Sequence, residues 1–116
     1  MTIAIYHNPR CSKSRKALEL IREHGIEPEV VLYLESPPTA KELKKIIDKL
    51  GIQPWELIRF NEEKARAQRL HESDKRSAKD WINILVTYPE LMERPIVVCN
   101  NRALICRPPE KVLELL

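Results

Sequence analysis

The sequence contains no hydrophobic run close to the roughly 18 residues that a membrane-spanning helix requires. It also carries little excess charge, because 20 Lys and Arg residues against 17 Asp and Glu residues give a net charge of only +3. So small a charge, dispersed along the chain, does not indicate binding to nucleic acid or to a membrane. The chain begins directly with a predicted strand rather than with a charged and then apolar leader. We therefore expect a cytoplasmic protein.

Cysteine is scarce, and its arrangement argues against two common kinds of small protein. Cys11, Cys99 and Cys106 form an odd and widely spaced set, which does not fit a disulfide framework and favours a reducing compartment. No CxxC pair is present, and the three histidines are scattered rather than placed at ligand spacing. A metal site, and a zinc site in particular, is therefore not expected.

The 116 residues, 43% of them hydrophobic, are enough for one domain with its own core. Apolar spacing and turn residues predict elements along the whole chain. In order these are a strand at 3–7, a helix at 12–24, a strand at 30–33, a helix at 40–50, a short turn at 54–58, helices at 62–69 and 77–88, strands at 96–99 and 103–106, and a last helix opened by Pro108 and Pro109.

This order of elements predicts an α/β fold of the thioredoxin-like type. The first strand, helix and strand form a βαβ unit with parallel strands, and the last elements form a ββα unit. A helical insertion over residues 39–93 separates the second strand from the third. We expect a single domain over residues 1–116 that includes this insertion.

The segment after the first strand places a cysteine at the start of a helix. Asn8 and Pro9 break the strand, Cys11 follows, and Ser12 opens a basic helix. A helix N-terminus offers unpaired backbone N–H groups and a partial positive charge, which lower the pKa of a thiol placed there. The alternative is that Cys11 packs as a small apolar residue, but its polar and charged neighbours do not suit a core. The segment therefore indicates a reactive thiolate beside an oxyanion site.

Two distant arginines are predicted to lie at the same end of the sheet as Cys11. Arg94 precedes the third strand and Arg107 follows the fourth, and antiparallel pairing brings both positions to the end of the first strand. Pro95 is expected to be a cis proline in a tight bend. Guanidinium groups bind tetrahedral oxyanions in bidentate fashion and stay charged. Most other arginines are expected on the solvated surface, namely Arg15, Arg22, Arg66, Arg69, Arg76 and Arg102.

A cysteine-dependent phosphatase is disfavoured, because its phosphate loop needs an arginine six positions after the cysteine and Ala17 stands there. The two remaining cysteines are expected in a hairpin. With a turn at Asn100 and Asn101, Cys99 lies opposite Arg102 and Cys106 opposite Pro95, so they should not form a disulfide.

The sequence resembles the glutaredoxin-coupled arsenate reductases and the related arsenate reductase-like proteins over essentially its whole length. Four separated blocks carry the resemblance: Tyr6-His7-Asn8-Pro9-x-Cys11-x-x-Ser14-Arg15, Leu57-Ile58-Arg59-x-Asn61-Glu62, Arg94-Pro95-Ile96-Val97-Val98 and Cys106-Arg107-Pro108.

The resemblance implies reduction of arsenate to arsenite without a bound cofactor. It makes Cys11 the nucleophile and Arg59, Arg94 and Arg107 the arsenate-binding triad, while His7 and Ser14 correspond to residues that help to stabilise the thiolate. Glutathione and glutaredoxin would supply the electrons, since the chain has no resolving cysteine near Cys11.

Two other functions fit the same fold. One is a regulatory adaptor, of the kind that binds RNA polymerase and usually carries a CxxC switch at the first helix. Here Ser14 takes the place of the second cysteine, which argues against the switch but not against an adaptor. The other is a monothiol oxidoreductase that acts on glutathionylated proteins.

Overall fold

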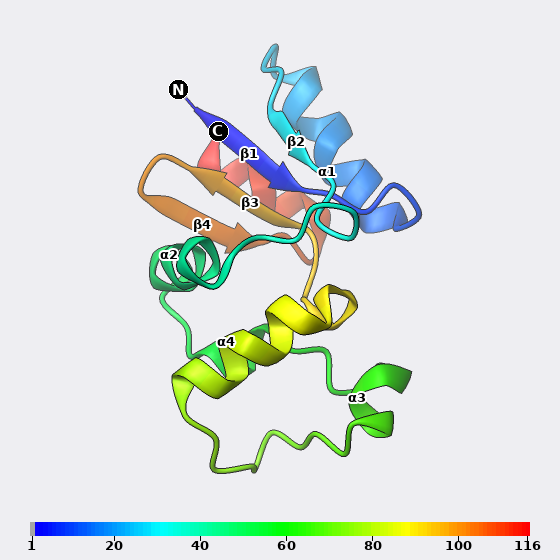
Figure 1. The fold of residues 1–116 in the computed structure, drawn as a ribbon. Coiled ribbons are helices and arrows are strands. Elements are labelled where there is room, and N and C mark those ends of the chain that lie inside the picture. Colours follow the sequence, from blue (N-terminus) through cyan, green and yellow to red (C-terminus); the bar gives the residue numbers. More distant parts are fainter. Residues whose placement is uncertain (1) are drawn as a thin grey trace. The chain divides into compact units, whose positions relative to one another are not determined.

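Two stretches of the chain that are far apart in sequence build one four-stranded sheet (Figure 1). The structure is a computed structural model that describes residues 2–116. Its strands are β1 (Ile3–Tyr6), β2 (Glu29–Val31), β3 (Ile96–Cys99) and β4 (Arg102–Ile105), in the spatial order β2-β1-β3-β4. β1 pairs with β2 in parallel, and β3 is antiparallel to both β1 and β4. The thioredoxin-like order predicted from the sequence is confirmed.

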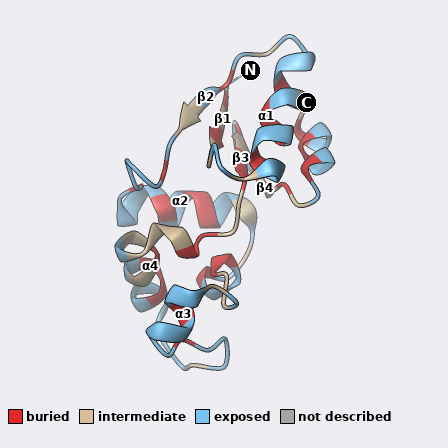
Figure 2. Ribbon diagram, turned by 90° about the vertical axis from the view of Figure 1, so that its right-hand side faces the viewer, coloured by how far each residue is buried: buried red, intermediate tan, exposed pale blue. Residues whose placement is uncertain are grey.

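One face of the sheet is covered by helix α1 (Ser12–Glu23) and by the 3-10 helix η3 (Pro109–Leu115), which pack against each other. The buried cluster between them alternates along the strands, as a half-covered sheet requires. Figure 2 shows the buried residues of α1 on the side of the helix that faces the strands. The cluster consists of Ile3, Ile5, Ala17, Leu18, Ile21, Val97, Cys99, Cys106, Val112 and Leu115.

The chain divides into two compact units. The sheet unit comprises the residues up to Ser36 together with Arg94–Leu116, and the insertion unit comprises Pro37–Glu93. The insertion unit contains α2 (Ala40–Leu50), the 3-10 helix η1 (Pro54–Leu57), α3 (Glu63–Ala67), α4 (Ala78–Thr87) and the 3-10 helix η2 (Pro89–Leu91). Its helices α2 and α4 pack on each other, and α4 also contacts η1 and η2.

Helix α2 has well-defined ends. Thr39 precedes it and forms a capping box with Glu42, in which each side chain accepts a hydrogen bond from the other residue's backbone N–H. Gly51 ends the helix in the left-handed region, with φ of 69°, where a residue without Cβ is favoured. The predicted start and end of this helix are both confirmed.

Several predicted elements differ in length. The strand expected at residues 30–33 is Glu29–Val31, because the carbonyl of Leu32 accepts hydrogen bonds from the N–H groups of Glu35 and Ser36 and turns the chain there. The helix expected at 62–69 is only α3, since Arg69 adopts a positive φ of 55°. The strand expected at 103–106 lies one residue earlier, and the final helix is of the 3-10 type.

No helix within residues 2–116 is both long enough and apolar enough to cross a lipid bilayer.

The capping box gives a prediction for stability. Replacing Thr39 with Ala removes the hydrogen bond to the N–H of Glu42, and we expect it to lower the free energy of unfolding by about 1 kcal/mol. Urea unfolding followed by tryptophan fluorescence measures this, because both tryptophans, Trp55 and Trp81, lie in the insertion unit. Thr39→Ser keeps a capping hydroxyl and should lose much less; an equal loss in both variants would contradict the capping role.

Candidate active site around Cys11

Cys11 is the N-cap residue of α1, at the end of a loop that hydrogen bonds hold in place. The Cys11 N–H donates to the carbonyl of Asn8 at 3.0 Å, and the Cys11 carbonyl accepts from Arg15 at 3.0 Å as the helix begins. The guanidinium of Arg15 also donates to the carbonyl of Pro9 at 2.8 Å. The loop is therefore tied to the first turn of α1 from both sides of the cysteine.

The surroundings of the Cys11 sulfur favour its thiolate. Partial burial raises the pKa of this thiol, but hydrogen bonds from the Ser14 backbone, the Arg94 side chain and the Lys13 backbone, together with the charge of Arg94, hold it below its ordinary value. The side chain is partly exposed, so a reactant can approach it. Cys11 thus has the depressed pKa and the access that a nucleophilic thiol needs.

Arg94 reaches the sulfur because β3 is antiparallel to β1. Tyr6 at the end of β1 lies opposite Ile96 at the start of β3, which brings the residues beyond each strand to one end of the sheet. Both the Arg94–Pro95 and the Arg107–Pro108 peptide bonds are cis. The expectation of a cis proline at position 95 is confirmed.

Arg107 lies next to Arg94 at this end of the sheet. Its guanidinium donates to the Arg94 carbonyl at 3.2 Å. Neither arginine forms an ion pair with a carboxylate within residues 2–116, and the Nε of Arg94 is buried without a hydrogen-bond partner there. Two guanidinium groups that no carboxylate neutralises make this end of the sheet favourable for an anion.

A second layer of polar contacts lies behind the cysteine. The His7 ring and the Ser14 hydroxyl are both buried and lie 2.6 Å apart between Nδ1 and Oγ. The same hydroxyl accepts the N–H of Asn8 at 3.1 Å. Burial and the charges of Arg22 and Arg15 lower the pKa of His7, which favours the neutral form of the ring. The direct partner of His7 is the Ser14 side chain, and the Ser14 backbone in turn forms a hydrogen bond with the Cys11 sulfur.

Arg59 belongs to the insertion unit, and its predicted contact with the oxyanion stays a prediction. Its guanidinium pairs with Glu62 at 2.8 Å, and its backbone N–H donates to the Leu91 carbonyl at 2.7 Å beside the bridge between Ile58 and Met92. Sequence reasoning missed both this pairing and the Arg15 clamp on Pro9, because a sequence does not show which polar groups a loop brings within bonding distance.

The other two cysteines are less accessible than Cys11. Cys99 and Cys106 are free and buried, and burial raises the pKa of the Cys106 thiol to about 12. In the hairpin Cys99 pairs with Arg102, while the Cys106 N–H donates to the Pro95 carbonyl at 2.8 Å. The predicted register, which keeps these cysteines from facing each other, is confirmed.

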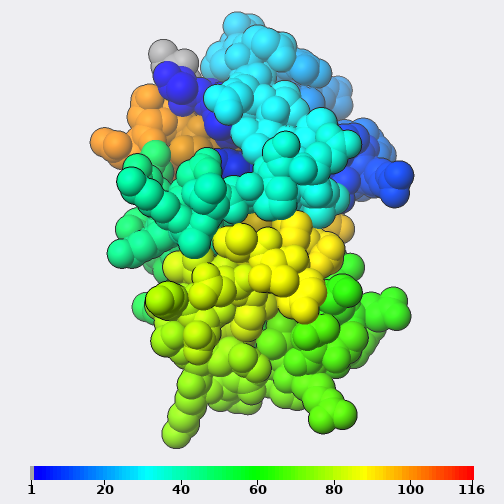
Figure 3. All heavy atoms as spheres, viewed as in Figure 1, coloured from blue at the N-terminus to red at the C-terminus, as the bar shows by residue number. Residues whose placement is uncertain are grey.

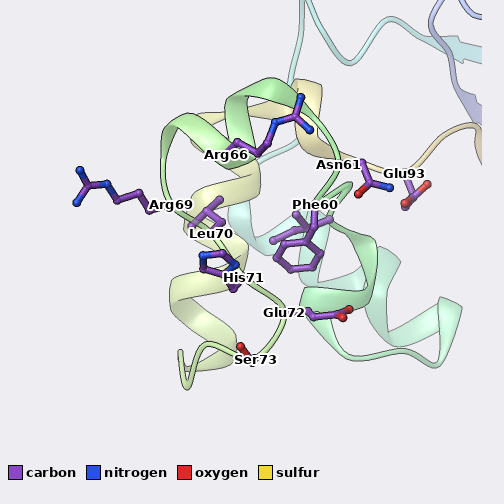
Figure 4. Close-up of a pocket in the computed structure, with 10 residues that line it drawn as sticks. Phe60, Asn61, Arg66, Arg69, Leu70, His71, Glu72, Ser73 and Glu93 are labelled. Carbon is purple, nitrogen blue, oxygen red and sulfur yellow. The ribbon is translucent and has the colours of Figure 1, made fainter.

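No group of three or more His, Cys, Asp or Glu side chains within residues 2–116 is arranged to hold a metal ion. A cavity of about 860 Å³ lies entirely within the insertion unit (Figure 4). Phe60, Leu70 and His71 are among its lining residues, and it contains none of the six predicted site residues.

Comparisons with known proteins agree on one family. The model of the ArsC family matches residues 6–115. The Escherichia coli protein named Uncharacterized protein YfgD is 50% identical over 114 residues, which cover 97% of this chain and 95% of that protein. An arsenate reductase of Escherichia coli is 46% identical over 114 residues, 98% of this chain and 80% of its own. The solved structure of an arsenate reductase from Vibrio cholerae superposes with a TM-score of 0.94 at 43% identity, over 100% of this chain and 98% of that one.

The arrangement around Cys11 gives a prediction for its reactivity. Replacing Arg94 with Ala removes a hydrogen bond and a positive charge, so the pKa of Cys11 should rise and alkylation at neutral pH should slow. The pH dependence of iodoacetamide labelling, resolved by peptide mass, measures this. Arg102→Ala removes an exposed arginine of β4 and should leave the profile unchanged, and Cys106 should label only after unfolding. Identical Cys11 profiles for Arg94→Ala and the unmodified protein would exclude this role of Arg94.

His7 gives a prediction for stability against pH. Its pKa is lower in the folded chain than its ordinary 6.5, so the unfolded chain binds more protons below about pH 6.5. Stability should therefore fall as the pH falls through that range, with His7 contributing at most about 1.4 kcal/mol per pH unit. Urea unfolding followed by circular dichroism between pH 7.5 and 5 should show a shallower decline for His7→Gln, whereas His24→Gln should keep the original slope.

Proposed function

Since the chain belongs to the ArsC family, we propose that it is an oxidoreductase that reduces arsenate to arsenite, with Cys11 as the nucleophile. The observation that carries this proposal is the convergence of the α1 backbone N–H groups and the Arg94 guanidinium on one partly exposed sulfur. Relatives named arsenate reductase, at 40–46% identity over nearly the whole chain, support arsenate as the oxyanion.

The first step is attack of the Cys11 thiolate on arsenic(V). A sulfur–arsenic bond forms, and one oxygen leaves arsenic as hydroxide or, after protonation, as water. Charge on the remaining oxygens is stabilised by the Arg94 guanidinium, with Arg107 beside it and Arg59 as the third arginine that the family resemblance implies. A donor already fixed in place needs no reorganisation during the reaction. The arginine positions therefore matter as much as their charges.

The later steps transfer two electrons to arsenic. Glutathione adds through its sulfur to the arsenic held on Cys11, and a second oxygen leaves as water. A glutaredoxin thiolate then attacks the glutathione sulfur, so that a mixed disulfide forms, the sulfur–arsenic bond breaks and its electron pair stays on arsenic. The product is arsenic(III) on Cys11, which water releases as arsenite with return of the thiol.

The need for an external thiol is supported by the state of the other cysteines. Resolving Cys11 from within the chain would require a second accessible thiol nearby. Cys99 and Cys106 are both buried, and the high pKa of Cys106 leaves almost no thiolate. Ser14 occupies the position of a CxxC partner and cannot form a disulfide. Glutathione and glutaredoxin are therefore the proposed electron donors, and the reducing cytoplasm is the proposed location.

The decisive assay is arsenate-dependent oxidation of NADPH in the presence of glutathione, glutaredoxin and glutathione reductase. Cys11→Ser should abolish it, because a hydroxyl has no comparable nucleophilic anion at neutral pH. Cys99→Ala removes a thiol that has no place in the mechanism and should keep the activity. A parallel reaction driven by thioredoxin and its reductase identifies the reductant and should be slow.

Undiminished turnover in Cys11→Ser would refute the mechanism. Turnover of a glutathionylated peptide without any turnover of arsenate would instead favour the monothiol oxidoreductase. Stoichiometric capture of a protein partner, again without arsenate turnover, would favour the adaptor.

A further inference from the structure

A small cavity of about 300 Å³ lies beside the loop that leads to Cys11, entirely within the sheet unit. One wall is the loop that follows β1, and the other is the turn that follows β2. Figure 3 shows these two segments side by side on the surface, in blue and in cyan. Besides His7, the lining residues are Asn8, Pro9, Arg10, Leu32, Leu34 and Glu35.

The cavity combines an apolar floor with opposite charges. Leu32 and Leu34 are among the few large hydrophobic residues that stay exposed, at 36% and 43%. Arg10 and Glu35 are exposed, and neither forms an ion pair within residues 2–116. The backbone beneath the two charges is ordered, because the Arg10 N–H donates to the Asn8 side chain and the Glu35 N–H to the Leu32 carbonyl.

We propose that this cavity binds glutathione and presents its thiol to the arsenic held on Cys11, an inference that rests on the proposed function. Glutathione has an ammonium group beside a carboxylate at one end and a second carboxylate at the other, with the thiol between them. Glu35 is placed to bind the ammonium and Arg10 a carboxylate. The two leucines contact the aliphatic part of the γ-glutamyl residue.

The size of the cavity suits a tripeptide rather than a protein segment. Small-molecule cavities begin at about 300 Å³, and they usually pair an apolar lining with a few polar groups that set orientation. This cavity has that volume and that composition. A neutral thiol would gain the apolar contact but not the two charge pairs, so the site discriminates among thiols by charge.

The lining of the cavity is adjacent to Cys11 along the chain. Arg10 immediately precedes Cys11, and the Cys11 N–H donates to the Asn8 carbonyl, which closes a tight turn against the cavity wall. The central thiol of a bound peptide then has a short path to the cysteine. In the proposed step the glutathione thiolate bonds to arsenic(V) and hydroxide leaves, with no change in the oxidation state of arsenic.

Thiol–disulfide exchange tests the cavity without arsenate. Cys11 thiolate attacks oxidised glutathione, a protein–glutathione disulfide forms, and one glutathione leaves as thiolate, so Cys11 is oxidised and that glutathione reduced. Rates are measured by intact mass for oxidised glutathione and for bis(2-hydroxyethyl) disulfide, which is neutral. Glu35→Gln and Arg10→Gln should each slow the first reaction about two- to fivefold, the range of an exposed ion pair, and leave the second unchanged.

Matched controls are Glu29→Gln in β2 and Arg102→Gln in β4, which remove exposed charges of the sheet unit away from the cavity lining and should alter neither rate. An equal fall with both disulfides would mean that the variants act on the thiolate itself, and it would overturn the proposal. Unchanged rates with oxidised glutathione in both cavity variants would overturn it as well.

The arsenate assay separates this inference from the proposed function. In active protein, the cavity variants should raise KM for glutathione and leave KM for arsenate unaltered. Selective loss of exchange with oxidised glutathione, in a protein that never turns over arsenate, would support the cavity and refute the arsenate proposal. Arsenate turnover with KM for glutathione unchanged in both variants would support arsenate reduction and refute the glutathione cavity.

Discussion

The antiparallel pairing of β1 with β3 determines which polar residues of the sheet unit meet at one end of the sheet. Ile5 lies opposite Val97, and both side chains are fully buried in the cluster beneath α1. The pairing fixes the register at the end of the sheet, where Cys11 follows one strand and Arg94 precedes the other. Arg94 and Cys11 therefore meet because two apolar strands pair.

The sequence was sufficient for most of the fold and for part of the site. The order of the elements follows from the alternation of apolar residues, and the bounds of α2 follow from its capping residues. The meeting of Cys11 with Arg94 follows from the antiparallel topology that this order predicts. The end of β2 was not predictable, because Leu32 continues an apolar run and only its carbonyl bonds make a turn. The Arg15 contact with Pro9 was equally inaccessible, since it depends on how a loop folds back on a helix.

The sheet unit shifts the pKa values of two of its thiols in opposite directions. Cys11 and Cys106 both belong to the sheet unit, yet the pKa of one is lowered and that of the other is raised to about 12. Burial raises the pKa of both thiols. Of these two thiols, only Cys11 receives backbone hydrogen bonds and a guanidinium contact that outweigh burial, so Cys11 is the more reactive of the pair.

The sheet unit is discontinuous, with Pro37–Glu93 inserted between its two parts. During synthesis on the ribosome, Cys11 leaves the exit tunnel long before β3. In that interval Arg94, which contacts the Cys11 sulfur in the finished protein, is not yet available. The sulfur of a nascent or truncated chain therefore lacks the hydrogen bond and the positive charge that Arg94 supplies. Full nucleophilicity arises only when the last quarter of the polypeptide has been made, which couples chemical competence to completion of the chain.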